Sequence, residues 1–342
     1  MGQKGFWDWD NRQERLVEQK DSLPRLQQMI PWEEFRSQLQ AIYNKPRKSN
    51  AGRKPIDVIL MFKILILQRL YNISDAELEY QINDRISFMR FLGLGIEDRI
   101  PDATTIWLFR EQIVAAGIMK DLFEQFEEYL RKKGYQAKGG QIIDATIVPV
   151  PKQHNSKKEN EQIRSGNAPE EWEGQPNKLS QKDLDARWTK KNGQSYFGYK
   201  DHINIDVEYG FIRCYEVTDA SVHDSQIVGG ILDIENESDE LWGDSAYRSE
   251  TEEKVLELMG FKSHIHERGY RNHPLKEQQK EQNRERSRIR AKVEHNFGSW
   301  VNEMGGKLIE VIGQSRVEVV IGLRNLAYNF KRYVYWQKQV IT

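Results

Sequence analysis

The first part of the chain places apolar residues at helical spacing. Pro55 stands where the first turn of a helix tolerates proline. Ser74 and Glu77 have the spacing of a capping box, which predicts a helix start. Helices are predicted over residues 56–71, 74–92, 105–116 and 119–133. Since no strand pattern occurs among residues 1–137, we expect an α-helical N-terminal domain there.

From Gly139 onwards the pattern becomes that of strands. The β-branched run Ile142–Val148 predicts a buried strand that contains Asp144. Residues 196–207 and 211–217 predict an antiparallel pair. A helix over 226–233, a strand ending near residue 244, a helix over 249–259, a strand over 261–265 and a long charged helix follow. This order predicts a mixed sheet flanked by helices.

The fold class expected is therefore α + α/β, with residues 1–137 as one domain and residues 138–342 as the other. A polar stretch at about residues 152–195 interrupts the second domain and contains few aliphatic side chains. It is either a disordered linker or an insertion, which could fold as a helical lobe.

Charge and apolar runs limit the function classes. The chain has 51 Lys and Arg against 52 Asp and Glu, so any affinity for DNA must come from local basic patches. Its single cysteine, Cys214, excludes an internal disulfide framework and fits a reducing cytosol. The most apolar run, Ile56–Leu70, contains three charged residues and is too short to span a bilayer. With no signal-peptide pattern at the start, we expect a soluble, cytoplasmic protein with no membrane partner.

Three acidic residues lie in unusual contexts: Asp144 in QIIDATIVPV, Asp244 in ELWGDSAYRS and Glu294 in RSRIRAKVEHNFG. An unpaired carboxylate in a buried strand costs several kcal/mol. If the first and fourth strands are neighbours, Asp144 and Asp244 meet, and Glu294 reaches them from the last helix. Two Mg²⁺ ions would satisfy such carboxylates and supply phosphodiester chemistry. Taken singly, the three acids also fit a strand-end turn, a helix N-cap and a helix-surface acid paired with Arg290.

The motifs IDATIV, FGYKDHI, VHDS, GDSAY and RxxxE followed by HNFG resemble those of the bacterial IS5-type insertion-sequence transposases. The likeness covers nearly the whole chain, including IDVILMFKILILQRLYNISD and GLRNLAYNFKRY. It implies an RNase-H-like core whose catalytic and metal-binding triad is Asp144, Asp244 and Glu294. It also implies two Mg²⁺ ions, for which Mn²⁺ can substitute, double-stranded DNA as the partner, and a homodimer or higher assembly on that DNA.

Related transposases carry a Tyr–Arg–Glu–Lys signature around the last acid. Arg290 and Glu294 match it, whereas Ser287 and Val301 stand where tyrosine and lysine would be, with Lys307 further on. A hairpin intermediate, which needs the full signature, therefore stays an open question.

Other residues have two readings each. His223 either orients a phosphate or water near the metals or caps a helix. Lys200 and His202 either touch the DNA backbone or belong to a salt-bridged strand edge. Residues 72–116 contain two helices and a turn, which fit either a helix-turn-helix reader or an ordinary bundle.

Two basic segments are candidates for DNA binding. Residues 45–55 form a basic loop of the kind that can lie in a minor groove. Residues 262–292 carry ten Lys or Arg and four Glu, directly before Glu294. The candidate DNA-binding residues are Arg47, Lys48, Arg53, Lys54, Arg284, Arg286, Arg288 and Lys292.

The function predicted is a DNA transposase that nicks transposon ends at terminal inverted repeats and joins the 3′-hydroxyls to target DNA. The alternatives are a metal-dependent nuclease without strand transfer and a transposase-derived DNA-binding protein without enzymatic activity.

Overall fold

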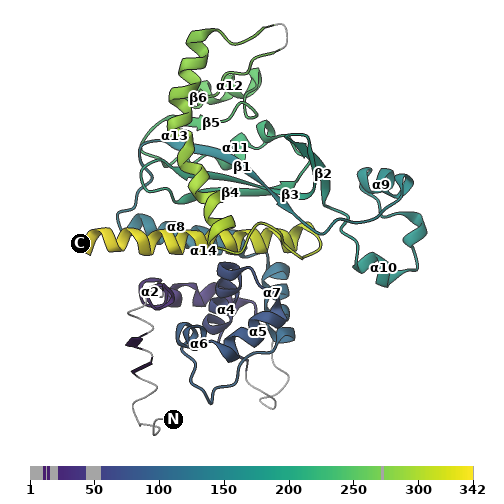
Figure 1. Cartoon of the computed structure of the whole chain (residues 1–342), viewed down its shortest axis with the longest axis vertical. Helices are drawn as coiled ribbons and strands as arrows, with labels where there is room; N and C mark the ends of the chain where they lie inside the picture. The colour runs from purple at the N-terminus through teal and green to yellow at the C-terminus, as the bar shows by residue number, and fades with distance from the viewer. Residues whose placement is uncertain (1–10, 13, 16–21, 44–54, 271–272, 342) are drawn as a thin grey trace. The chain divides into compact units, whose positions relative to one another are not determined.

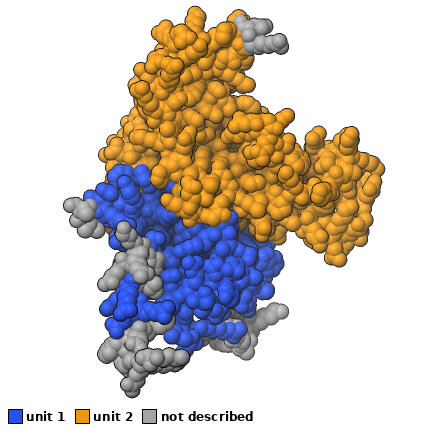
Figure 2. Space-filling model, in the orientation of Figure 1, with its two compact units in different colours: residues 1–125, 326–342 blue, residues 126–325 orange. Residues whose placement is uncertain are grey.

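The computed structural model describes residues 11–12, 14–15, 22–43, 55–270 and 273–341. The chain forms two compact units (Figure 2): residues 1–125 with 326–342, and residues 126–325. This division differs from the domain boundary expected from the sequence in residues 126–137 and 326–342. The helices α8 (Met119–Lys132) and α14 (Gln314–Ile341) each contribute to both units.

The first unit is helical (Figure 1). Its elements are α2 (Leu23–Met29), η1 (Trp32–Phe35), α3 (Arg36–Ala41), α4 (Val58–Tyr71), α5 (Asp75–Asp84), α6 (Ile86–Leu92) and α7 (Ala103–Ala116), with parts of α8 and α14. Ser74 accepts a hydrogen bond from the backbone N–H of Glu77, as the sequence predicts. The single helix expected over 74–92 is instead divided, because Arg85 adopts an extended backbone between α5 and α6.

Aromatic side chains build the centre of this unit. Trp32 packs edge-on against Phe330 with ring centroids 5.3 Å apart, and Phe35 packs against Phe62 at 5.1 Å. Because Phe330 belongs to α14, the core of the unit contains residues from both ends of the chain. No helix in the described part of the chain is long and apolar enough to cross a membrane.

The second unit contains a six-stranded mixed sheet. Its strands are β1 (Gln141–Pro149), β2 (Arg187–Lys191), β3 (Gln194–Asp206), β4 (Ile212–Asp219), β5 (Glu240–Gly243) and β6 (Lys262–Ile265). The order is β2-β3-β1-β5-β6, and β4 also pairs with β3. β1 runs antiparallel to β3 and parallel to β5, so the first and fourth predicted strands are neighbours, as expected.

Helices flank this sheet in the predicted order. They are η3 (Asp224–Gln226), α11 (Val228–Ile231), α12 (Glu250–Leu258), α13 (Glu277–Asn302) and the first part of α14. α11 is shorter than the predicted 226–233, since two glycines, a poor helix-forming pair, lie in its middle and Leu232 is extended. The apolar core under α11 and α12 includes Ile143, Leu241 and Tyr247.

The polar stretch before β2 is folded, so it is an inserted lobe and not a linker. It contains α9 (Lys157–Arg164), η2 (Glu170–Trp172) and α10 (Pro176–Ser180), which lie beyond the β2 end of the sheet in Figure 1. Trp172 is its small core: the ring is buried, and the indole N–H donates to Glu159 Oε1 at 2.7 Å. Ser156 and Glu159 form a capping box that starts α9.

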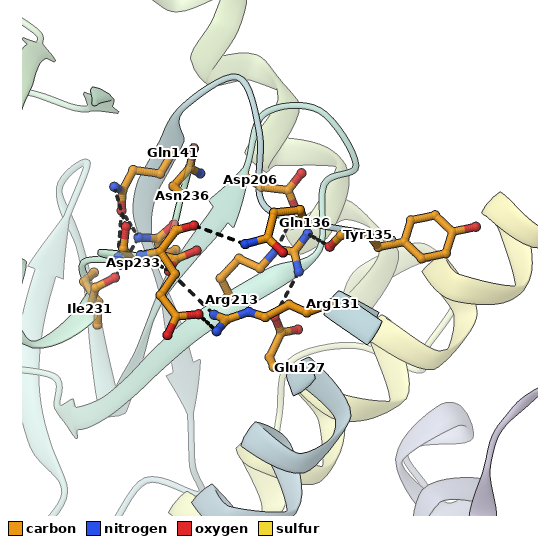
Figure 3. A network of polar contacts seen from close by, with 12 residues as sticks. Glu127, Arg131, Tyr135, Gln136, Gln141, Asp206, Arg213, Ile231, Asp233 and Asn236 are labelled. Carbon is orange, nitrogen blue, oxygen red and sulfur yellow. Dashed lines mark hydrogen bonds and ion pairs between the residues drawn. The ribbon is translucent and has the colours of Figure 1, made fainter. Parts of the chain in front are cut away.

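A buried polar network supports the far end of the sheet (Figure 3). Arg213 on β4 donates to Asp206 Oδ1 at 2.9 Å and to Glu127 Oε2 at 3.0 Å, and its third contact is the carbonyl of Tyr135 at 2.9 Å. Burial raises the pKa of Glu127 to about 7, although the charge of Arg213 opposes that rise. The network ties α8 to the hairpin that pairs with β1.

Gly140 allows β1 to enter the sheet beside β5. Its φ is +88°, and a Cβ at this position would lie 2.6 Å from the carbonyl oxygen of Glu240 and 2.4 Å from the ring of Trp242. Only glycine fits both the backbone and this spacing. The residue therefore sets the approach of the two strands that carry the candidate aspartates.

Candidate active site

Asp144 lies within β1, and Asp244 directly follows β5, the strand that runs parallel to β1. β1 and β5 pair with Gln141 opposite Leu241 and Ile142 opposite Trp242. Continuing this register places Asp144 opposite Asp244, on strands that lie roughly 4.8 Å apart in any sheet. Burial raises the pKa of Asp144 to about 6, the charge of Arg290 lowers it, and the like charge of Asp244 raises it. The two carboxylates are thus close enough for the charge of Asp244 to affect the pKa of Asp144.

Backbone and side-chain donors orient both carboxylates. Ala145 N–H donates to Asp144 Oδ1 at 2.8 Å, and Ala246 N–H donates to Asp244 Oδ1 at 2.7 Å. Arg290 on α13 donates through Nη1 to Asp144 Oδ2 at 2.6 Å. Each aspartate thus keeps a fixed direction on its strand.

Glu294 lies at the edge of this arrangement. Its Oε1 is 3.9 Å from Nη2 of Arg290, and its side chain is 69% exposed. Arg290 therefore stands between the glutamate and Asp144. Within the described ranges, no three His, Cys, Asp or Glu side chains gather closely enough to hold a metal ion. The carboxylates of Asp144 and Asp244 suit a hard divalent cation. The side chain of Glu294 would have to turn toward these two aspartates to become a third ligand.

His266 reaches the same region and was not anticipated. It follows β6, where Ile265 pairs with Gly243, so it lies beside Asp244 at the ends of three parallel strands. Its Nε2 is 3.4 Å from Ser287 Oγ on α13. Burial and the charge of Arg290 lower its pKa, while Asp244 raises it. No recognisable sequence motif surrounds His266. It lies near the aspartates only because β6 pairs with β5 in this register.

Lys307 also approaches the aspartates, from the segment after α13. Its ammonium donates to Thr146 Oγ1 at 2.6 Å, two residues along β1 from Asp144. Burial and the charge of Lys191 lower the pKa of Lys307, and Asp144 raises it. A cation is therefore present near Asp144, although Val301 occupies the signature position for lysine.

Two of the three supporting residues on or near β3 make contacts within the second unit. His223 caps η3, accepting from the backbone N–H of Ser225 at 3.3 Å, which is the capping reading. Lys200 forms an ion pair with Asp224 at 2.7 Å, which is the salt-bridge reading.

The expectation that His202 touches a DNA backbone needs correction. The residue is fully buried, between β1 and β4, and its Nε2 lies 3.0 Å from Thr218 Oγ1. Burial lowers its pKa to about 4, so the ring is neutral at pH 7. From Phe197 to Asp206, every residue of β3 except Lys200 is buried, so both faces of this strand are covered.

The candidate DNA-binding residues on α13 lie on two different faces of the helix. Arg284, Arg288 and Lys292 follow each other at i, i+4 spacing, and all three are exposed. Arg286 turns the other way, with Nη1 donating to the carbonyl of Ile265 at 2.8 Å. Lys292 donates to the carbonyl of Val207 at 2.9 Å. The other four basic candidates, Arg47, Lys48, Arg53 and Lys54, lie outside the described residues.

Comparison with known proteins identifies two families. Residues 11–112 match the family described as "Transposase domain (DUF772)", and residues 135–330, more than half of the chain, match the family described as "Transposase DDE domain". Among solved structures, the chain is similar to the cryo-EM structure of a piggyBac transposase synaptic complex with hairpin DNA. That similarity has a TM-score of 0.46 and 12% sequence identity, over 92% of this chain and 74% of the other.

Proposed function

We propose that this chain, which belongs to the Transposase DDE domain family, nicks DNA at the terminal inverted repeats of its own element and joins the freed 3′-hydroxyls to target DNA. The observation that carries the proposal is the register of β1 and β5, which sets Asp144 beside Asp244. The motifs around these residues favour the IS5 type, and the strand order favours an RNase-H-like core.

The proposed roles follow from the contacts. Asp144 and Asp244 supply carboxylate oxygens for divalent ions, which a DDE domain implies. We infer that these are two Mg²⁺ ions, replaceable by Mn²⁺, with Glu294 as the third ligand residue. Such ions would activate the attacking hydroxyl and stabilise the leaving oxygen.

Arg290 holds Asp144 in place until the ions bind. Its guanidinium neutralises the carboxylate that burial makes costly to ionise. Glu294 lies one helical turn further along α13, and because its side chain is exposed, it is free to turn toward the aspartates. Binding of the ions would release Arg290 for a phosphate of the DNA.

Double-stranded DNA is the proposed partner. The exposed row of Arg284, Arg288 and Lys292 lies on the face of α13 turned away from Arg290 and Glu294, since residues two apart on a helix do not face each other. We assign phosphate contacts of a neighbouring part of the duplex to this row. We assign recognition of the terminal repeats to the helical N-terminal region and its basic loop. Two transposon ends require a homodimer or higher assembly, which acts at the bacterial nucleoid.

A strand-transfer assay tests the proposal. The purified full chain is incubated with pre-cut terminal-repeat DNA, a supercoiled target plasmid and Mg²⁺, with Asp144→Ala as the inactive variant. Asp239→Ala, which removes an exposed aspartate of the same unit, is its matched control. Joined products that disappear only in Asp144→Ala would support the transposase. Cutting without joining would favour the nuclease, and specific binding without any reaction would favour the non-enzymatic binder.

A further inference from the structure

A cavity of about 190 Å³ opens beside Asp244 in the second unit. Residues of β1, β2 and β3 form most of its wall. Its polar lining consists of Thr146, Thr189, Lys190, Lys191, Lys200, Asp224 and Asp244. The cavity thus has three lysines and two aspartates, and one of these aspartates, Asp224, is already paired with Lys200.

The β2–β3 hairpin fixes two of these lysines. Lys191 pairs with Gln194, and the two residues between them, Asn192 and Gly193, have φ values of 51° and 81°. Two consecutive positive φ angles are the mark of a tight two-residue turn whose twist matches the strands. Alternate strand residues share a face, so Thr189 and Lys191 point to the same side. The hairpin tip is therefore a firm support for Lys191.

The lysines differ in what they already bind. Lys200 donates to Asp224 at 2.7 Å and to the carbonyl of Val222 at 2.7 Å, so its charge is balanced. The side chain of Lys191, in contrast, makes no hydrogen bond or ion pair with any residue that the structure describes. Lys191 lines the same cavity as Asp244, so an unpaired ammonium and a carboxylate of the candidate site belong to one cavity.

An ammonium group without a partner, such as that of Lys191 at this cavity, is satisfied by an anion bound beside it. Lys307 and Lys191 approach from different segments, and the hydroxyl of Thr146, already bonded to Lys307 at 2.6 Å, stands on the strand of Asp144. Threonine hydroxyls and ammonium groups are the donors that phosphate oxygens accept from. The arrangement fits an anionic group held next to the aspartates.

We propose that this cavity binds one phosphodiester of the DNA strand on which Asp144 and Asp244 act, with Lys191 donating to a non-bridging oxygen. Thr189, on the same face of β2 as Lys191, flanks that phosphate from the hairpin. The inference rests on the proposed function, since it names the residues that seat the strand in the same site. It gives the β2–β3 hairpin a role in positioning the substrate.

Replacement of single phosphates tests this assignment. Terminal-repeat duplexes, each with one neutral methylphosphonate near the cleavage position, are titrated into full-length wild type and Lys191→Gln by fluorescence anisotropy in Ca²⁺. One replacement is expected to weaken wild-type binding roughly 5- to 20-fold, in line with a lost charge-assisted contact. The same replacement should leave Lys191→Gln unchanged, and the salt dependence of that variant should fall by about 0.9 in log–log slope.

Lys157→Gln is the matched control, because it removes an equally exposed lysine of the same unit from the inserted lobe, away from the cavity. If Lys191→Gln and Lys157→Gln respond alike to every replacement while wild type still cleaves, the cavity assignment is wrong and the proposed function stands. If wild type binds a phosphodiester through Lys191 but never cleaves, the cavity assignment stands without the proposed chemistry. Wild type that binds no terminal-repeat DNA overturns both.

Discussion

Asp144 should make the metal-free protein less stable as the pH rises. Burial raises the folded-state pKa to about 6 from the ordinary 3.8. The folded chain therefore holds this proton more tightly than the unfolded chain. The resulting stabilisation is complete below pH 3.8 and is lost as the pH rises through 6. The shift in the Asp144 pKa contributes about 3 kcal/mol in total to the free energy of unfolding. About 1.4 kcal/mol of this contribution is lost between pH 5 and pH 8.

The perturbation that isolates this group is Asp144→Asn, which keeps an oxygen for Arg290 but cannot ionise. Urea unfolding of both proteins is measured from pH 5 to pH 8 in EDTA, and the difference in unfolding free energy is plotted against pH. Other titrating groups cancel in that difference. Wild type should lose stability relative to the variant by about 1.4 kcal/mol across this range, with a plateau above pH 7. Parallel curves, or a wild type that gains stability with pH, would show that Arg290 outweighs burial and refute the reasoning.

Three further outcomes are expected. Glu294→Gln should retain DNA binding but slow cleavage by at least roughly 10- to 100-fold, the loss seen when residues that support metal ligands are replaced. Cleavage at the wild-type rate in a gel assay would remove Glu294 from the triad. Arg213→Ala leaves two buried carboxylates uncompensated and should lower the unfolding free energy in urea by about 3–5 kcal/mol; a loss below 1 kcal/mol would contradict this. Gly140→Ala should lower Tm more than Gly134→Ala, since both have positive φ but only Gly140 has close neighbours; equal shifts would argue against the packing account.

Much of the sheet could be predicted from the sequence because the strands carry their own signals. The run that contains Asp144 is β-branched, and the glycine-rich and charged segments between runs separate the elements. That β1 and β5 are neighbours was one arrangement that this order allowed, and the structure shows the pairing. The inserted lobe was not predictable in the same way, because a single tryptophan, Trp172, provides its core in an otherwise polar stretch.

The cationic part of the site escaped prediction for a different reason. Lys191, His266 and Lys307 come from three segments with no motif in common, and only the register of the strands and the course of the chain after α13 bring them near the aspartates. For His202, contact with DNA was one prediction from the sequence, whereas the structure buries the residue. Its strand alternates as one with a solvent-exposed face would, but both faces of β3 are covered beyond Phe197.

The discontinuous first unit has a consequence for synthesis on the ribosome. Phe330, which packs on Trp32, is translated only after all of residues 126–325. At about 5–20 residues per second, those 200 residues take roughly 10 to 40 s to emerge. During that interval the N-terminal helices lack part of their core and expose aromatic surface. The catalytic unit can thus fold before the helical unit is complete, and a transcript truncated within α14 would yield a chain whose first unit never closes.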